Sequence, residues 1–265
     1  MKIIVTGAAG RMGLSIITAL YQDPELLLTG VVERKEHKYI NQDIGILAGI
    51  GNTGLIVADN LEEIIGEGDV LIDFTTPQAT IEHLKYAYGY QKKMVIGTTG
   101  LSDDQITQIK ECSQKIAVVF SPNMSIGVNL LFKITEEVTK ILGPEFDIEI
   151  LEAHHHHKKD APSGTAKKLA EIVALSLSRD LKKVGIYGRE GLVGERKEEE
   201  IGILSMRGGD IVGEHNVIFA GEGERLELIH KAHSRMTFAK GALKAAKWLS
   251  NKSCGLYNMN DVLGI

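Results

Sequence analysis

The chain has 265 residues, of which 43% are hydrophobic and 25% charged, and its formal net charge is -5 at pH 7. This length suffices for two compact domains, and the weakly acidic charge without a Lys/Arg-rich block gives no sign of a nucleic-acid-binding surface. With no apolar run near the ~20 residues that cross a bilayer, and Cys112 and Cys254 as the only cysteines, we expect a cytoplasmic protein whose partners are small molecules.

The first elements are a short apolar strand, Ile3 to Val5, a glycine-rich turn, Gly7 to Gly13, and an amphipathic helix, Leu14 to Tyr21. In this order, the first glycine allows a tight turn, Gly10 lets the backbone approach a pyrophosphate, and Gly13 lets the helix pack close to the sheet. The pattern therefore predicts a dinucleotide site at the start of the helix.

A second strand, Thr29 to Val32, ends at Glu33, about 20 residues beyond the glycines as a dinucleotide fold requires. Glu33 can accept a hydrogen bond from the ribose 2'-hydroxyl of NADH, whereas Arg34 can pair with the 2'-phosphate of NADPH. The pair leaves the choice between NADH and NADPH open, and an ordinary exposed loop is the alternative for these two residues taken alone.

Three later segments repeat one design, in which a buried type of strand runs into a turn of small or polar residues. They are Val70 to Asp73 before Phe74 to Pro77, Met94 to Ile96 before Gly97 to Gly100, and Ile116 to Phe120 before Ser121 to Met124. Gln78 to Tyr90 and Ser102 to Ser113 read as crossover helices, the second with Ser102 as its cap. We expect a parallel sheet whose turns line one crevice at the carboxyl ends of its strands.

The second half changes character, because several strands follow a single helix. The expected strands are Asp147 to Ala153, Ile201 to Met206, Ile211 to Val212, Val217 to Ala220 and Arg225 to His230, with a helix over Thr165 to Leu177. We predict an open mixed or antiparallel sheet packed on helices, with one face free to meet another subunit.

The predicted fold class is therefore α/β, a doubly wound parallel sheet plus a central α+β substrate domain with an open mixed sheet. A last helix, Phe238 to Leu249, and the segment after it are expected to return to the first domain. We assign residues 1–125 and 235–265 to dinucleotide binding and residues 126–234 to substrate binding and oligomerisation.

The most informative stretch, Glu152 to Thr165, packs four histidines and two lysines directly before a helix start at Ser163. An unpaired helix N-terminus binds carboxylates or phosphates, so a doubly anionic substrate could be held and protonated here. A solvated loop and a metal site are the alternatives. We expect no metal, because adjacent histidines cannot all face one ion and no cysteine or second histidine cluster lies nearby.

Taken together, these segments resemble one family nearly from end to end, the 4-hydroxy-tetrahydrodipicolinate (dihydrodipicolinate) reductases of the diaminopimelate route to lysine. The matching motifs are Val5 to Gly13, Asp73 to Pro77, Val95 to Gly100, Ser121 to Asn129, Glu152 to Ala166 and Arg207 to His215. The motif from Glu152 to Ala166 is far more specific than the glycine turn.

The resemblance implies a Rossmann domain, a central substrate domain, a homotetramer joined through the central sheets, and NADH and/or NADPH as cofactor. It implies that His154 is the general acid, that Lys158 donates a proton or anchors the substrate, and that His156 is a bystander. Implied substrate contacts are His155, Gly164 and Thr165. Implied cofactor contacts are Gly7, Ala8, Ala9, Gly10, Arg11, Met12, Glu33, Arg34, Gly97, Thr98, Thr99, Ser121, Pro122, Asn123 and Met124.

Three rival functions remain open at this point. Another two-domain NAD(P)-dependent dehydrogenase would share the first half but need a different substrate motif. A non-catalytic dinucleotide sensor would have no need of a proton donor. A metal hydrolase that uses the histidines would hold stoichiometric zinc.

Overall fold

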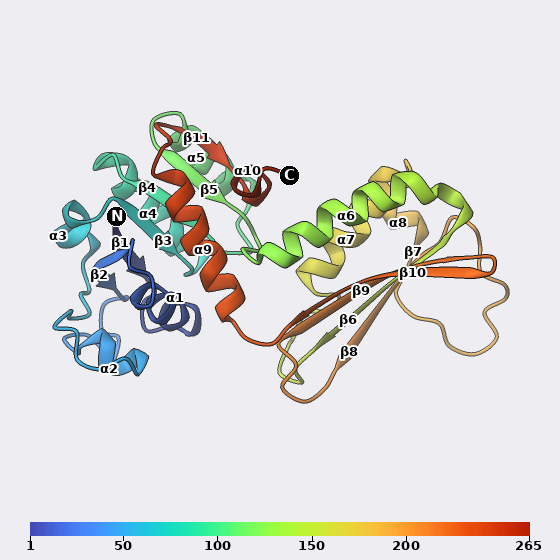
Figure 1. Ribbon diagram of the computed structural model, residues 1–265, viewed down its shortest axis with the longest axis horizontal. Coiled ribbons are helices and arrows are strands. Elements are labelled where there is room, and N and C mark those ends of the chain that lie inside the picture. The colour runs from blue at the N-terminus through green and yellow to red at the C-terminus, as the bar shows by residue number, and fades with distance from the viewer. The chain divides into compact units, whose positions relative to one another are not determined.

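The computed structural model describes residues 1–265 and divides into two compact units. The first unit contains Met1–Ile126 and Arg235–Ile265, and the second contains Gly127–Ser234. Each unit has its own sheet (Figure 1). Each also has its own hydrophobic core.

The first unit is built on a six-stranded sheet in the order β11-β5-β4-β3-β1-β2, in which every neighbouring pair is parallel. Its strands are β1 (Lys2–Thr6), β2 (Leu27–Val32), β3 (Val70–Asp73), β4 (Lys93–Ile96), β5 (Ala117–Phe120) and β11 (Gly255–Tyr257). Because all strands run the same way, the turns that follow them meet at one edge, as the predicted parallel sheet requires.

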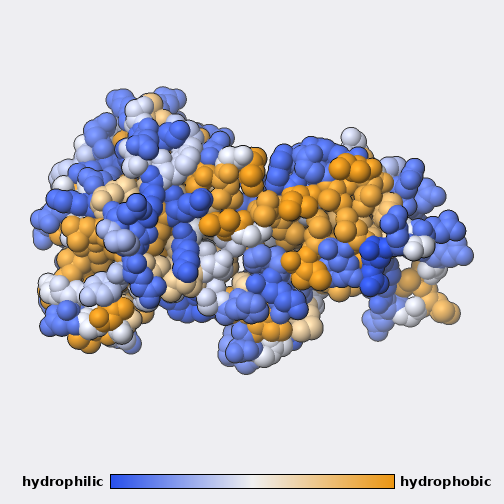
Figure 2. Space-filling view, viewed as in Figure 1, coloured by the Kyte–Doolittle hydropathy of each residue, from blue (hydrophilic) through white to orange (hydrophobic).

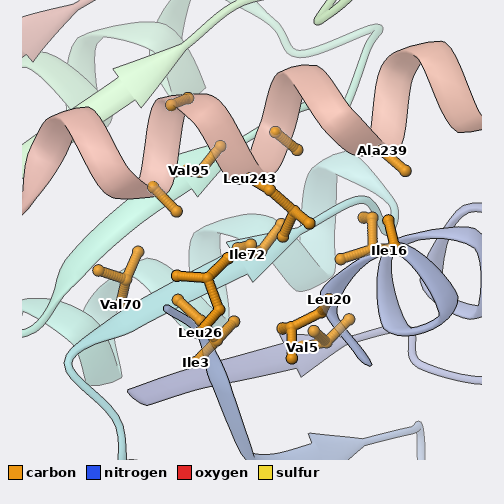
Figure 3. Close-up of a cluster of buried hydrophobic side chains, with 14 of the residues drawn as sticks. Ile3, Val5, Ile16, Leu20, Leu26, Val70, Ile72, Val95, Ala239 and Leu243 are labelled. Carbon is orange, nitrogen blue, oxygen red and sulfur yellow. The ribbon is translucent and has the colours of Figure 1, made fainter. Parts of the chain in front are cut away.

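Helices cover both faces of this sheet, because successive strand residues point to opposite sides. Ile3, Val5 and Ile72 belong to one core cluster with α1 (Arg11–Tyr21) and α9 (Met236–Leu249), part of which Figure 3 shows. Ile4 and Leu71, the alternate residues, belong to a second cluster with α4 (Pro77–Gly89) and α5 (Asp103–Ser113). The sheet is thus doubly wound, and α9 at the end of the chain completes it. Shorter helices in this unit are α2 (Ile44–Ala48), α3 (Leu61–Ile64), η1 (Ile65–Glu67) and α10 (Met259–Leu263).

Side-chain hydrogen bonds explain where the crossover helices begin. The predicted cap Ser102 is confirmed, since it caps α5 in a capping box with Gln105. Helix α4 begins at Pro77, one residue before the predicted start, and is capped by Thr76, which was not predicted as a cap. A glycine, Gly10, stands at the cap of α1, and no side chain caps that helix. The first N–H groups of α1 are therefore left for an anion, as the glycine turn predicts.

The second unit holds a five-stranded mixed sheet in the order β10-β9-β6-β8-β7. Its strands are β6 (Asp147–His154), β7 (Gly185–Ile186), β8 (Ile201–Arg207), β9 (Gly213–Gly221) and β10 (Glu224–Ala232). β6 pairs parallel with β8 and antiparallel with β9, and this confirms the predicted mixed sheet.

Two helices pack on one face of this sheet, α6 (Ile126–Leu142) and α7 (Gly164–Ser176), while α8 (Leu181–Val184) and η2 (Gly143–Glu145) are short. Ile148 and Ile150 of β6 and Leu169 and Val173 of α7 are fully or almost fully buried in the core between them. On the opposite face the sheet leaves apolar side chains exposed, namely Leu151, Met206 and Ile229.

In the second half, one predicted strand is wrong and two observed elements lie outside the predictions. The 17-residue helix α6 was not predicted, although it carries an apolar stripe that includes Val128, Leu131 and Val138. Exposed Leu130, Ile134 and Ile141 also lie on it, and Figure 2 shows an apolar area where α6 runs. The predicted strand Ile211 to Val212 does not form, because the Ile211 carbonyl accepts the His155 N–H at 2.7 Å instead, and β9 begins at Gly213. The two-residue strand β7 was not predicted either.

No helix of the chain combines the length and the apolar character that crossing a membrane requires.

Candidate active site

In the first unit, the glycine turn has the backbone shape that the sequence predicts. Gly7 has a φ of 60°, in the left-handed region, and its carbonyl accepts the Gly10 N–H at 3.0 Å. A Cβ at Gly13 would lie 2.3 Å from the Gly7 carbonyl oxygen. Only a glycine lets α1 approach the turn this closely, which leaves the uncapped helix start open to a pyrophosphate.

A groove of about 820 Å³ opens beside this turn within the first unit. Its lining includes Gly7, Gly10, Glu33, Arg34, Lys35, His37, Asp59, Asn60, Phe74, Thr75, Thr76 and His83. The Glu33 carboxylate accepts the Ala9 N–H at 2.9 Å, so the acidic residue after β2 is held at the glycine turn. The glycine turn, Glu33 and Arg34 thus line one groove together. The turn that follows β3, Phe74 to Thr76, lines it as well.

The other two predicted turns follow strands of the same sheet but do not line this groove. A Cβ at Gly97 would lie 2.2 Å from the Phe74 ring, so this glycine is needed for packing. The Thr98 side chain is buried and faces away from solvent, and the Met124 side chain belongs to the hydrophobic core. Ser121 is also buried, and its hydroxyl donates to the Asn123 carbonyl at 2.9 Å. Only backbone groups of Thr98 and Met124 are therefore available to a cofactor.

Sequence reasoning missed the polar network that holds these turns. Asp73, fully buried at the end of β3, accepts hydrogen bonds from the hydroxyls of Thr6, Thr75, Thr80 and Thr98. Its other close partner is His83, whose Nδ1 lies 2.5 Å from the Asp73 Oδ2. Burial opposes ionisation of Asp73, but the hydrogen bond and charge of His83, together with the hydrogen bonds from the Thr6 and Thr80 hydroxyls, outweigh it and lower the pKa of the carboxyl.

Asp73 therefore ties β1, the turn after β4, and helix α4 together at the carboxyl edge of the sheet. The available signal was an acidic residue that closes an apolar strand run, followed within ten positions by three threonines and a histidine. That pattern has no fixed spacing, so it is recognised only once the strands are aligned.

In the second unit, the predicted histidine His154 is the last residue of β6 and is 8% exposed. Its Nδ1 lies 2.6 Å from Oε2 of Glu152, which sits two positions earlier on the same face of the strand. The ring of His215, on the neighbouring strand β9, lies edge-on to that of His154 with 5.3 Å between the ring centroids. Burial lowers the pKa of His154, and the hydrogen bond that its Nδ1 donates to the Glu152 carboxylate opposes this effect.

Glu152 is 2% exposed and paired with Arg207, which sequence reasoning placed in a motif but gave no role. The two Arg207 Nη atoms lie 2.8 and 2.7 Å from the two carboxylate oxygens of Glu152. Burial opposes ionisation of Glu152, but the hydrogen bonds from Arg207 and His154 outweigh it and lower its pKa to about 2. Glu152 is thus an anion at neutral pH.

The helix that follows begins as predicted. Ser163 caps α7 by accepting the Ala166 N–H at 3.2 Å, and its own N–H donates to Glu152 Oε1 at 3.0 Å. The Ser163 hydroxyl also lies 3.0 Å from Nε2 of His215. No acidic side chain stands in the first turn of α7, and Gly164 is exposed with open space beside it. This helix start can take a carboxylate.

The remaining residues of the histidine loop separate into two groups. Lys158 is half-buried, and its Nζ lies 2.9 Å from Oδ1 of Asp160. His156 and His157 are exposed, with their ring centroids 3.7 Å apart. The chain contains no group of three or more His, Cys, Asp or Glu side chains arranged to hold a metal ion.

Comparison with known proteins matches both halves of the chain to one family. The family model "Dihydrodipicolinate reductase, N-terminus" covers residues 1–124, and "Dihydrodipicolinate reductase, C-terminus" covers residues 127–263. A curated 4-hydroxy-tetrahydrodipicolinate reductase of Syntrophus aciditrophicus (strain SB) is 51% identical over 264 residues, which is 100% of this chain and 98% of that protein.

Solved structures show the same architecture. The dipicolinate-bound dihydrodipicolinate reductase from Paenisporosarcina sp. TG-14 aligns with a TM-score of 0.76 and 26% identity, over 97% of each chain. An amine dehydrogenase from Mycobacterium smegmatis aligns with a TM-score of 0.58 over 98% of this chain and 95% of that one. At 12% identity, this second likeness concerns the fold alone.

Proposed function

The chain belongs to the dihydrodipicolinate reductase family, and from this membership we infer that it is an NAD(P)H-dependent oxidoreductase of lysine biosynthesis. Its reaction is the reduction of 4-hydroxy-tetrahydrodipicolinate, with loss of water, in the diaminopimelate route. The observation that carries the assignment of the site is the buried His154–Glu152 pair beside an open helix start in the second unit.

The first unit fits a nicotinamide dinucleotide, which supplies the hydride when it is bound. The fit rests on Gly7, on the close packing at Gly13, and on the uncapped start of α1. We assign the pyrophosphate to the backbone of residues 7–12. Glu33 and Arg34 are the groups that face the adenosine ribose, because both line the groove beside that turn. Backbone groups of residues 97–99 and 121–124 are the remaining proposed contacts.

The second unit supplies the proton. Reduction of a conjugated imine at C4 leaves negative charge as an enamine, which must be protonated at C3. His154 is the proposed general acid, since an imidazole titrates near neutral pH and this one is partly shielded from water. A bound dicarboxylate would raise the pKa of His154, so substrate binding itself favours the acid form.

The substrate carboxylates need donors and positive charge. The start of α7 has backbone N–H groups at Gly164, which is exposed, and at Thr165, and Lys158 and His155 lie in the loop directly before it. We assign these four residues to substrate binding. Lys158, already paired with Asp160, is either a charge anchor or a second proton donor.

We further propose that residues 1–125 and 235–265 bind the dinucleotide, that residues 126–234 bind substrate, and that the second sheet joins subunits into a homotetramer. Exposed Leu151, Met206 and Ile229, on the sheet face opposite α6 and α7, support an interface there. We place the protein in the cytoplasm, where reduced nicotinamide dinucleotides serve biosynthesis.

The test is the loss of NADH or NADPH absorbance when the protein meets the freshly made condensation product of pyruvate and aspartate semialdehyde. Rapid oxidation supports the proposed reaction. Dinucleotide binding without any oxidation would contradict it and would favour a dehydrogenase for another substrate or a dinucleotide sensor. Size measurement by light scattering tests the tetramer separately.

A further inference from the structure

The Glu152 carboxylate accepts hydrogen bonds from three different elements of the second unit. Glu152 Oε2 accepts from His154 Nδ1 at 2.6 Å and from Arg207 Nη1 at 2.8 Å. Its Oε1 accepts from Arg207 Nη2 at 2.7 Å and from the Ser163 N–H at 3.0 Å. The carboxylate thus joins the end of β6, the end of β8 and the first residue before α7.

The identity of the partners fixes the protonation of the histidine. An ionised carboxylate only accepts hydrogen bonds, so the His154 nitrogen that faces Glu152 must carry a hydrogen. Nε2 is then the nitrogen free to exchange a proton. Gly213 lies against it, since a Cβ at that position would be 3.0 Å from His154 Nε2, and the glycine keeps this side of the ring clear.

We propose that Glu152, held by Arg207, is a positioning residue with two roles. It orients His154 for proton donation, and it fixes the start of α7, which binds a substrate carboxylate. The proposal deepens the function given above and rests on it. Glu152 touches neither substrate nor cofactor in this role, and it acts through His154 and Ser163.

The surrounding charges show why a carboxylate is needed. The groups that face His154 are Glu152 on its own strand, Arg207 from β8, His215 from β9 and Lys158 from the loop before α7. Glu152 is the only anion among these four, and the two cations disfavour an imidazolium. Removing the Glu152 charge therefore removes the one contact that favours protonated His154.

Glu152→Gln tests this role, because glutamine keeps the size of the side chain and loses its charge. We expect kcat to fall about 100-fold or more, because losing a carboxylate that holds a catalytic imidazole in its tautomer costs up to about 10⁴-fold in kcat, with a smaller change in KM. The basic limb of the kcat against pH profile should move to lower pH, since His154 then loses its proton more readily. Glu171→Gln is the matched control, because Glu171 lies on α7 in an exposed ion pair with Lys168. It should match the wild type.

A measurement on the unaltered protein covers the case in which Glu152→Gln does not fold. The ring nitrogens of His154, assigned by their absence from the His154→Gln spectrum, should show the Nδ1–H tautomer above the histidine's titration. The Nε2–H tautomer would overturn the proposal, and so would a Glu152→Gln enzyme with unchanged kcat and pH profile. Wild-type turnover together with loss in His154→Gln shows that the proposed function stands, so a failure confined to Glu152→Gln concerns this inference alone.

Discussion

Glu152 and His154 stand two positions apart on β6, and Oε2 of the first lies 2.6 Å from Nδ1 of the second. The alternation of a strand puts both side chains on the same face, the one that packs against α7. A strand end therefore presents a buried acid–imidazole pair beside a helix start.

His154→Gln should lower kcat by at least about 100-fold and change KM far less, because a general acid contributes 10²- to 10⁴-fold to the rate. Steady-state kinetics with NADH and the pyruvate–semialdehyde condensation product measure both constants. His156→Gln is the control, since that side chain is exposed. An unchanged kcat in His154→Gln would remove His154 from the proton step.

Lys158→Arg separates anchoring from proton donation. An arginine keeps the positive charge and can still pair with Asp160, as Lys158 does at 2.9 Å, but it does not give up a proton at neutral pH. As an anchor, the residue tolerates this change with appreciable activity, and Lys158→Ala raises KM. A kcat loss in Lys158→Arg as large as that of His154→Gln would instead assign the lysine to proton donation.

Gly13→Ala should weaken or abolish dinucleotide binding and destabilise the first unit by roughly 1 to 3 kcal/mol, the usual cost of overpacking. Its Cβ would meet the Gly7 carbonyl oxygen at 2.3 Å. Thermal unfolding and NADH titration measure the two effects. Gly89→Ala, at the end of α4, has no atom within 4 Å of the new Cβ and should leave both unchanged. Normal NADH affinity in Gly13→Ala would contradict the assigned turn.

Arg34→Ala should reduce kcat/KM for NADPH by about tenfold or more and leave that for NADH close to the wild type, because a charge-assisted contact to the 2'-phosphate is lost. Glu33→Ala should act in the opposite sense and weaken NADH more than NADPH. The ratio of the two kcat/KM values is the measurement. Equal losses for both dinucleotides in Arg34→Ala would place the arginine outside the ribose site.

Stability should fall below neutral pH through His215. Burial, reinforced by the neighbouring His154, lowers the pKa of His215 to about 3, whereas an unfolded histidine titrates near pH ~6.5. The unfolded chain therefore binds more protons between these values. This contribution to the free energy of unfolding is fully present above pH ~6.5 and is lost as the pH falls toward the pKa of His215 in the folded protein. The loss is roughly 1 to 2 kcal/mol between pH 6.5 and 5.

Urea unfolding at several pH values measures this slope. His215→Asn should flatten it and also loosen Ser163, whose hydroxyl lies 3.0 Å from His215 Nε2. His156→Asn, at an exposed histidine, should keep the slope of the wild type. If the slope persisted in His215→Asn, the stability loss would have to come from other groups.

Much of the fold could be predicted because it depends on short segments. Ile3 to Val5 with Gly7 to Gly13, the cap Ser102 and the cap Ser163 each carry their structural reason within a few residues. The helix α6 could not be predicted in the same way. Its buried apolar residues have helical spacing, but the exposed apolar residues Leu130, Ile134 and Ile141 on the same helix obscure that periodicity. The segment Ile211 to Val212 has the composition of a strand, but the Ile211 carbonyl accepts a hydrogen bond from the His155 N–H instead of pairing in a sheet.

The sequence by itself identified the segments proposed for the chemistry: the glycine turn, Glu33 and Arg34 after β2, and the histidine–lysine loop before a capped helix. Tertiary structure alone decided how they are held. Glu152 meets Arg207 55 positions away, and Asp73 collects Thr6, Thr98 and His83 from three other segments. The physical reason is that strand register brings residues distant in the sequence into hydrogen-bonding range. Burial then strengthens each of these hydrogen bonds and raises the cost of losing one. The spacing of residues along the sequence does not reveal that register.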